Sequence, residues 1–179
     1  MTAEERVHVV RLLKVSEKGY LSLIADVNQV QWNWNPEPDR WSVGQTAEHI
    51  MQSEVILSRR LQHAIESPAN PDWQRKTAGK AELLERVMAD RGQKAIAPEP
   101  TRPQGQSREE VVRRFKDVRM QIIKFAEETQ IPLEQYTAEH PFPVFGTLNA
   151  YQWLLLVPLH NMRHDQQIAE VKAAPGYPK

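Results

Sequence analysis

Residues 111–125, VVRRFKDVRMQIIKF, carry the most regular pattern in the chain, and this pattern indicates the fold class. Apolar residues recur at alternating steps of four and three, which places them on one face of an α-helix. These residues are Val111, Phe115, Val118, Ile122 and Phe125. Ser107 lies just before the run and Glu110 follows three positions later, so the two fit a capping box at the start of a helix. We therefore expect an amphipathic helix that begins after Ser107.

Two further helices are expected on the amino-terminal side. Thr2 with Glu5 fits a capping box and opens a long amphipathic helix that should end just before Asn33. Its apolar residues are Val7, Val10, Val15, Leu21, Ile24 and Val27. Ser42 with Gln45 opens the second helix, which should run from position 43 to about 67. The residues that it should bury are Val43, Ala47, Ile50, Leu57 and Leu61.

A fourth helix should follow Gly146 and Thr147 and continue to about Lys172. A long proline-rich connection separates the second helix from the third, and a short helix is expected in it at residues 80–91. No strand pattern with a period of two is sustained anywhere, so the class is all-α. Four helices with one long crossover between the second and the third predict a four-helix bundle.

The composition narrows the class of protein. At 179 residues, with no shift in composition, a single domain over residues 1–179 is expected. The 23 basic and 23 acidic residues balance and form no long run of one sign, so neither nucleic acid nor a membrane is expected as a partner. Absence of cysteine excludes disulfides, thiolate metal sites and a cysteine nucleophile. The amino terminus lacks the pattern of a signal peptide, and a cytoplasmic location is expected.

His160 and His164 are the most informative pair for function. Four residues are about one helical turn, so both imidazoles project from the same face and can close on one divalent ion. The same face carries Trp153, Leu156, Val157, Ile168 and Val171, which indicates that the pair looks inward. A set of hydrogen-bonded core histidines is the alternative. In a bundle, His49 on a facing helix completes a set of three nitrogens.

Several neighbouring side chains have simpler expected roles. Glu48 points about 100 degrees away from His49 on an ideal helix, and a surface or interhelix ion pair is its expected role. Gln45 is assigned to the capping box. Gln167 lies nearly one turn after His164 and suits a contact with a metal-binding histidine or with a bound substrate. Six other residues have simpler expected roles outside the site. His140 is expected in a loop hydrogen bond, with contact to the pocket as the alternative, and His8 and His63 are expected to be exposed. The tryptophans expected to plug the end of the core are Trp32, Trp34 and Trp41.

Three groups of short motifs resemble the DinB-like family, which includes the YfiT-type metal-dependent hydrolases. They are Trp41-Ser-Val-Gly-Gln followed by Glu48-His49; His140-Pro with Phe145-Gly-Thr-Leu; and Leu159-His160, Arg163-His164 and Gln167-Ile168. The resemblance covers most of the chain up to about Lys172. It implies a four-helix bundle, commonly a homodimer, with a divalent metal held by His49, His160 and His164.

The resemblance also implies a class of chemistry. The expected function is that of a metal-dependent enzyme in which zinc or nickel activates a low-molecular-weight thiol for transfer to a small-molecule substrate. A hydrolase that uses metal-bound water is one alternative. A non-catalytic, stress-associated metal-binding protein is another. No carboxylate accompanies the three histidines as an obvious general base, so the catalytic residues stay unassigned.

Overall fold

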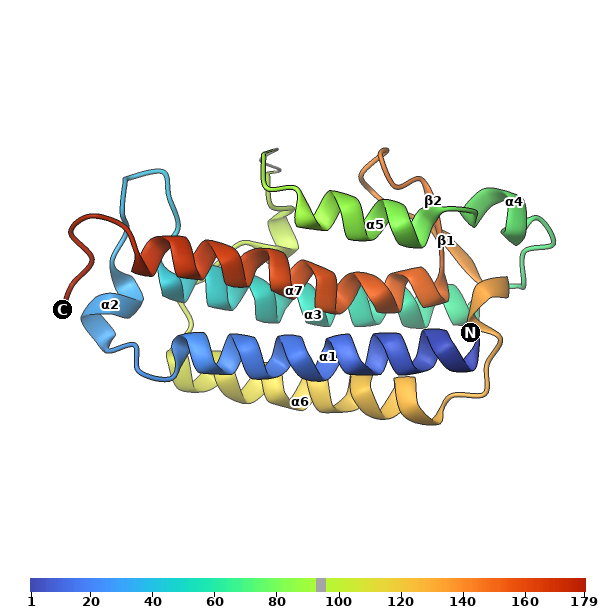
Figure 1. Cartoon of the computed structure of the whole chain (residues 1–179), viewed down its shortest axis with the longest axis horizontal. Coiled ribbons are helices and arrows are strands. Elements are labelled where there is room, and N and C mark those ends of the chain that lie inside the picture. The colour runs from blue at the N-terminus through green and yellow to red at the C-terminus, as the bar shows by residue number, and fades with distance from the viewer. Residues whose placement is uncertain (93–95) are drawn as a thin grey trace.

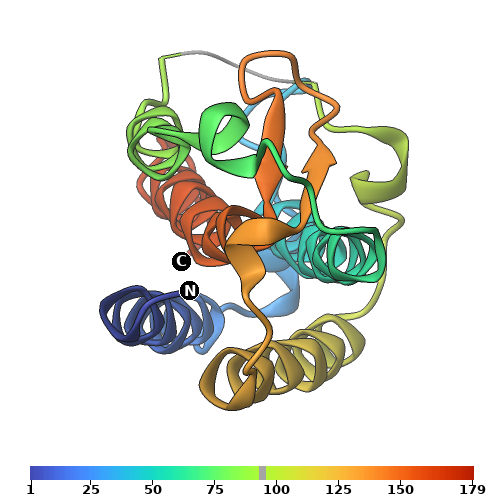
Figure 2. The same cartoon turned by 90° about the vertical axis from the view of Figure 1, so that its right-hand side faces the viewer.

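Four long helices lie side by side along the long axis of the molecule, in a computed structural model that describes residues 1–92 and 96–179 (Figures 1 and 2). They are α1 (Ala3–Ile24), α3 (Val43–Glu66), α6 (Arg108–Glu128) and α7 (Ala150–Lys172). The all-α bundle expected from the sequence is confirmed. None of the helices in the described residues is long and apolar enough to cross a membrane.

Side-chain caps fix where these helices begin. Reciprocal capping boxes open α1, α3 and α7, the last with Asn149 and Gln152. The box expected for α6 forms only in part. Ser107 Oγ accepts from the backbone of Glu110, but the Glu110 carboxylate pairs with Arg113 instead of turning back to the cap.

The first helix is shorter than expected, and the prediction of one helix up to Asn33 was wrong. α1 ends at Ile24, and Asn28 with Gln31 makes a new capping box that opens α2 (Gln29–Asn33). This break lets α2 fold over the end of the bundle, where Trp32 packs directly on the backbone of Gly44. Trp32 therefore plugs the end of the core, as predicted.

The crossover between α3 and α6 covers one side of the bundle. It contains α4 (Trp73–Thr77), α5 (Lys80–Ala89) and the 3-10 turn η1 (Glu99–Thr101). α5 confirms the expected short helix, and it packs on α7 on the side away from α1 and α6 (Figure 2). Arg163 of α7 donates to the carbonyl of Met88 and Arg91 donates to the carbonyl of Arg163, so the end of α5 is fixed beside the middle of α7.

A small hairpin leads into α7 and was not expected. After the 3-10 turn η2 (Leu133–Gln135), β1 (Thr137–Glu139) pairs antiparallel with β2 (Thr147–Asn149), in the register Thr137 to Asn149. Strands of three residues are too short to show a period of two in a sequence. The hairpin brings Asn149 to the first turn of α7, where its side chain caps the helix.

The core divides into two apolar clusters with a polar layer between them. On α7, one cluster ends at Val157 and the other begins at Ile168. The same division occurs on α1 around Ser16, on α3 around Glu54 and on α6 around Arg119, and all three of these side chains are buried. The middle of the bundle is thus polar, and the histidines of α7 lie at this level.

Candidate metal centre

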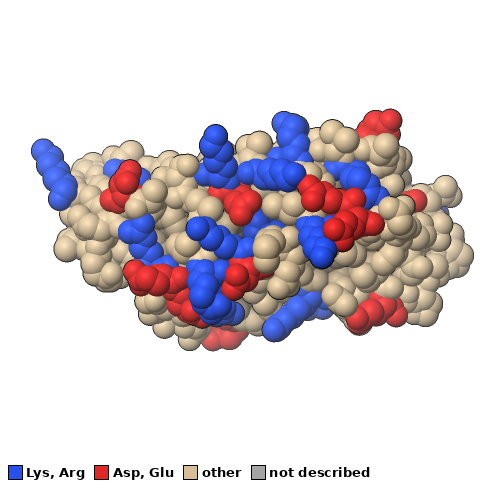
Figure 3. All heavy atoms as spheres, turned by 90° about the horizontal axis from the view of Figure 1, so that it is seen from below, with Lys and Arg blue, Asp and Glu red and all other residues tan. Residues whose placement is uncertain are grey.

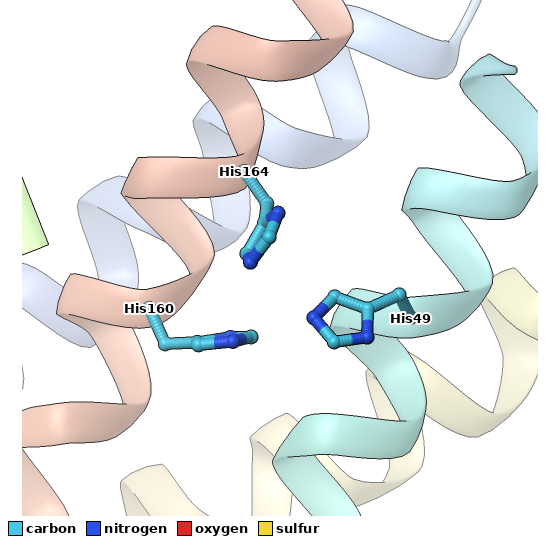
Figure 4. Close-up of side chains that lie close together, drawn as sticks. All are labelled: His49, His160 and His164. Carbon is cyan, nitrogen blue, oxygen red and sulfur yellow. The ribbon is translucent and has the colours of Figure 1, made fainter. Parts of the chain in front are cut away.

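His49 of α3 faces His160 and His164 of α7, and the three rings converge on one point (Figure 4). One ligand-capable nitrogen from each ring lies within 4.8 Å of the other two. An ion bound at about 2.1 Å by each of three nitrogens holds them about 3.4 Å apart in tetrahedral geometry. Side-chain shifts on the order of 1 Å would therefore close the set around an ion.

Hydrogen bonds to carbonyl oxygens assign the tautomers of two of these rings. His49 Nδ1 lies 2.8 Å from the backbone oxygen of Thr101 in η1, and His164 Nδ1 lies 2.9 Å from Oε1 of Gln167. A carbonyl oxygen only accepts, so each Nδ1 carries the proton and each Nε2 keeps its lone pair. Metal-binding histidines are held in the same way, and the predicted contact of Gln167 behind His164 is confirmed.

Burial keeps all three imidazoles in the neutral form that binds metals. It lowers the pKa of His49, which is 4% exposed. Burial lowers the pKa of His164 to about 3, and that of His160 well below its ordinary value, with the neighbouring histidines adding to both shifts. His160 and His164 are partly exposed, whereas His49 is buried.

Glu48, next to His49, forms no ion pair with any of the described residues, although the sequence suggested one. Its side chain is 1% exposed, and its carboxylate accepts from the backbone amides of Gln104, Gly105 and Gln106 at 2.8 to 3.2 Å. The crossover returns over α3 here and supplies amide donors in place of a cation. Glu48 and His49 together tie residues 101–106 to the helix that carries the candidate site.

Comparison with known proteins places the chain in a family. Residues 12–168 match the DinB superfamily, and this match includes all three histidines. The chain belongs to the DinB superfamily. The uncharacterized protein YuaE of Bacillus subtilis (strain 168) is similar, with 25% identity over 142 residues that cover 78% of this chain and 82% of YuaE. No solved structure gives a significant match.

A buried ion pair lies in the polar layer of this DinB-superfamily chain and was missed in the sequence. Arg119 of α6 is fully buried, and its Nε donates to Glu54 Oε2 of α3 at 3.0 Å while Nη2 donates to Oε1 of the same carboxylate. Arg119 Nη1 also donates to Ser16 Oγ of α1 at 2.8 Å. The signal was present, since Glu54 and Arg119 both occupy positions at helical spacing within apolar stripes.

The same arginine reaches the turn of α7 that carries the histidines. Its Nη2 donates to Asn161 Oδ1 at 2.9 Å, and Asn161 Nδ2 donates to Asp165 Oδ1 at 2.9 Å. Asn161 and Asp165 directly follow His160 and His164 in the chain. All four long helices are thus connected through polar contacts behind the candidate site, which fixes the rotation of α7 that aims its histidines at α3.

Trp41 was expected to plug the end of the core, but it borders the candidate site, because its ring centroid lies 5.0 Å from that of His49. His140 makes the predicted loop hydrogen bond, accepting from the amide of Phe142 at 3.0 Å. Its ring stacks on Trp153, two helical turns before His160. The remaining three lie elsewhere: Trp34 packs edge-on against Tyr177, His8 pairs with Glu85, and His63 is exposed.

Proposed function

We propose that this chain is a metal-dependent enzyme that activates a low-molecular-weight thiol for transfer to a small-molecule substrate. The observation that carries the proposal is the convergence of three neutral imidazoles from two facing helices within 4.8 Å. Such a donor set fits zinc or nickel, since imidazole nitrogen suits both ions. The chain has no cysteine, so a thiol that takes part in the chemistry must come from outside the protein.

A divalent ion on neutral imidazoles keeps its charge and lowers the pKa of a thiol or water that it binds. His49, His160 and His164 would hold that ion. Thr101 and Gln167 keep the protons of His49 and His164 on Nδ1, which leaves Nε2 free to coordinate. Because His160 and His164 are more exposed than His49, a small molecule would enter beside these two residues.

Thiol dependence separates this proposal from its alternatives. The protein loaded with zinc or nickel would be mixed with cysteine, N-acetylcysteine or 2-mercaptoethanol and a panel of epoxides, activated alkenes and nitroaryl halides. The proposal predicts metal-dependent loss of thiol that a His49→Gln variant does not show. Turnover of esters or amides without any thiol would instead support a metal-dependent hydrolase. Bound metal with no turnover of either kind would favour a non-catalytic metal-binding protein.

A homodimer is proposed as well. α1 and α6 lie side by side, and the face that they form carries basic and acidic side chains interspersed (Figure 3). Val7 and Val15 of α1 are 69% and 52% exposed, although the sequence pattern suggested that they face the core. Apolar side chains that point outward on the first helix support contact with a second copy of the chain.

A further inference from the structure

Three buried polar side-chain atoms have no hydrogen-bond partner among the described residues: Gln52 Oε1, Trp153 Nε1 and Tyr177 OH. An unpaired buried acceptor costs free energy, and native proteins usually satisfy such atoms with a ligand or an ordered water. Gln52 differs from the other two in its position. It follows His49 by three residues on α3, so the two side chains are neighbours on the helix surface.

The orientation of the Gln52 amide is set by Glu48. Gln52 Nε2 donates to Glu48 Oε1 at 3.0 Å, and the reversed amide would place two acceptor oxygens together. Glu48 is itself held by three backbone amides and by the side-chain amide of Gln106, at 3.0 Å. The Gln52 oxygen therefore cannot satisfy itself by rotating toward the carboxylate, and it remains a buried, unpartnered acceptor three residues after His49 on α3.

We propose that Gln52 Oε1 accepts a hydrogen bond from the small molecule that the three-histidine site binds, and so selects ligands with an N–H or O–H group next to the metal-binding atom. Gln52 is 9% exposed, so the interaction is shielded from water. A shielded acceptor rejects an analogue that lacks the donor, because the acceptor then stays unpaired. Glu48 acts through Gln52 as a positioning residue. The inference rests on the proposed metal site.

A matched pair of probes tests the inference without any enzymatic turnover. Acetohydroxamate chelates a metal ion through two oxygens and carries an N–H beside them, whereas N-methylacetohydroxamate carries a methyl group there. The dissociation constants of both would be measured on the cobalt(II)-loaded protein from its visible absorption. The ratio of the two dissociation constants gives the preference for the N–H probe. Comparing this ratio between the wild type and a variant removes the intrinsic effect of the methyl group, because that effect is the same in both proteins.

The test variant is Gln52→Met, which keeps the length of the side chain and removes the acceptor. Gln62→Met is the matched control, since Gln62 on the same helix makes a similar bond to Glu66 on the surface. We expect Gln52→Met to reduce the preference for the N–H probe by about three- to tenfold, the value of one hydrogen bond. Gln62→Met should keep the preference of the wild type. Gln52→Leu replaces Gln52→Met if that variant does not fold.

The outcomes separate this inference from the proposed function. If the wild type binds no cobalt, the metal site fails and the inference fails with it. If cobalt binds but the ratio of dissociation constants is the same in the wild type and the Gln52 variant, the metal site stands. Gln52 is then satisfied in another way, for example by an ordered water, and the inference is overturned.

Discussion

Replacing Arg119 by Met tests whether the polar layer holds the bundle together. The substitution removes the one cation that contacts the buried Glu54 carboxylate among the described residues, and it leaves Ser16 and Asn161 without their donor. Breaking a buried ion pair on one side costs about 3–5 kcal/mol, because an uncompensated charge stays in the core. We expect Arg119→Met to lower the free energy of unfolding by that amount.

Urea unfolding followed by circular dichroism would measure this loss, with two comparisons. Arg113→Met on the same helix removes ion pairs to Glu110 and Asp117 on the surface, and it should cost less than about 1 kcal/mol. The double variant Glu54→Leu/Arg119→Met removes both charges, and it should be more stable than Arg119→Met alone. A loss below about 1 kcal/mol for Arg119→Met, or a double variant less stable than the single one, would show that the buried ion pair does not hold the bundle together.

The pH dependence of the same variant has a definite sign. Burial raises the pKa of Glu54 above its ordinary value, and Arg119 opposes this shift. Without Arg119 the pKa rises further, so the folded state keeps a proton that the unfolded state releases above about pH 4.3. Folded Arg119→Met therefore gains stability as the pH falls. The difference in free energy of unfolding between the wild type and Arg119→Met should therefore be smaller at pH 5 than at pH 7, as measured by urea unfolding at both pH values.

Three shorter predictions concern the metal, the end of the core and the dimer. The lowered pKa values of the three histidines mean that protons compete weakly with a metal, so zinc affinity by titration should change by less than about twofold between pH 7.5 and pH 6; a tenfold loss would contradict those shifts. A Cβ at Gly44 would lie 2.4 Å from Trp32 Nε1, so Gly44→Ala should cost about 1–3 kcal/mol in urea unfolding. Gly19→Ala, whose Cβ meets its nearest atom at 3.6 Å, should leave stability equal or higher, and equal losses would argue against the packing of the tryptophan. Val7→Glu/Val15→Glu should convert a dimer to a monomer in light scattering; an unchanged mass would place the interface elsewhere.

The helices that position the site could be predicted because their signals are local. The apolar spacing of α3, α6 and α7 and the hydroxyl caps at Ser42 and Ser107 lie within single helices. The signal for the break after α1 was also local, but a search for serine or threonine at the cap position does not find it. Asn28 with Gln31 and Asn149 with Gln152 are capping boxes with an amide in place of the hydroxyl.

The surroundings of the histidines depended on contacts that no local pattern contains. The five donors to Glu48 include backbone amides 56 to 58 residues away. These amides reach Glu48 only because the crossover folds back over α3. Arg119 and Glu54 are 65 residues apart, and each alone looks like an interruption of an apolar stripe. The histidines could be predicted because two share one helix and the bundle supplies the third.

The metal content of the untagged protein would show whether His49, His160 and His164 hold an ion. Elemental mass spectrometry would compare the wild type with a His160→Ala/His164→Ala variant and with a His8→Ala/His63→Ala control, which removes two histidines outside the candidate site. We expect about one zinc or nickel ion per chain in the wild type and the control, and loss of that ion in the folded His160/His164 variant. Absence of metal from the wild type after reconstitution with either ion, or equal metal in all three proteins, would contradict this expectation.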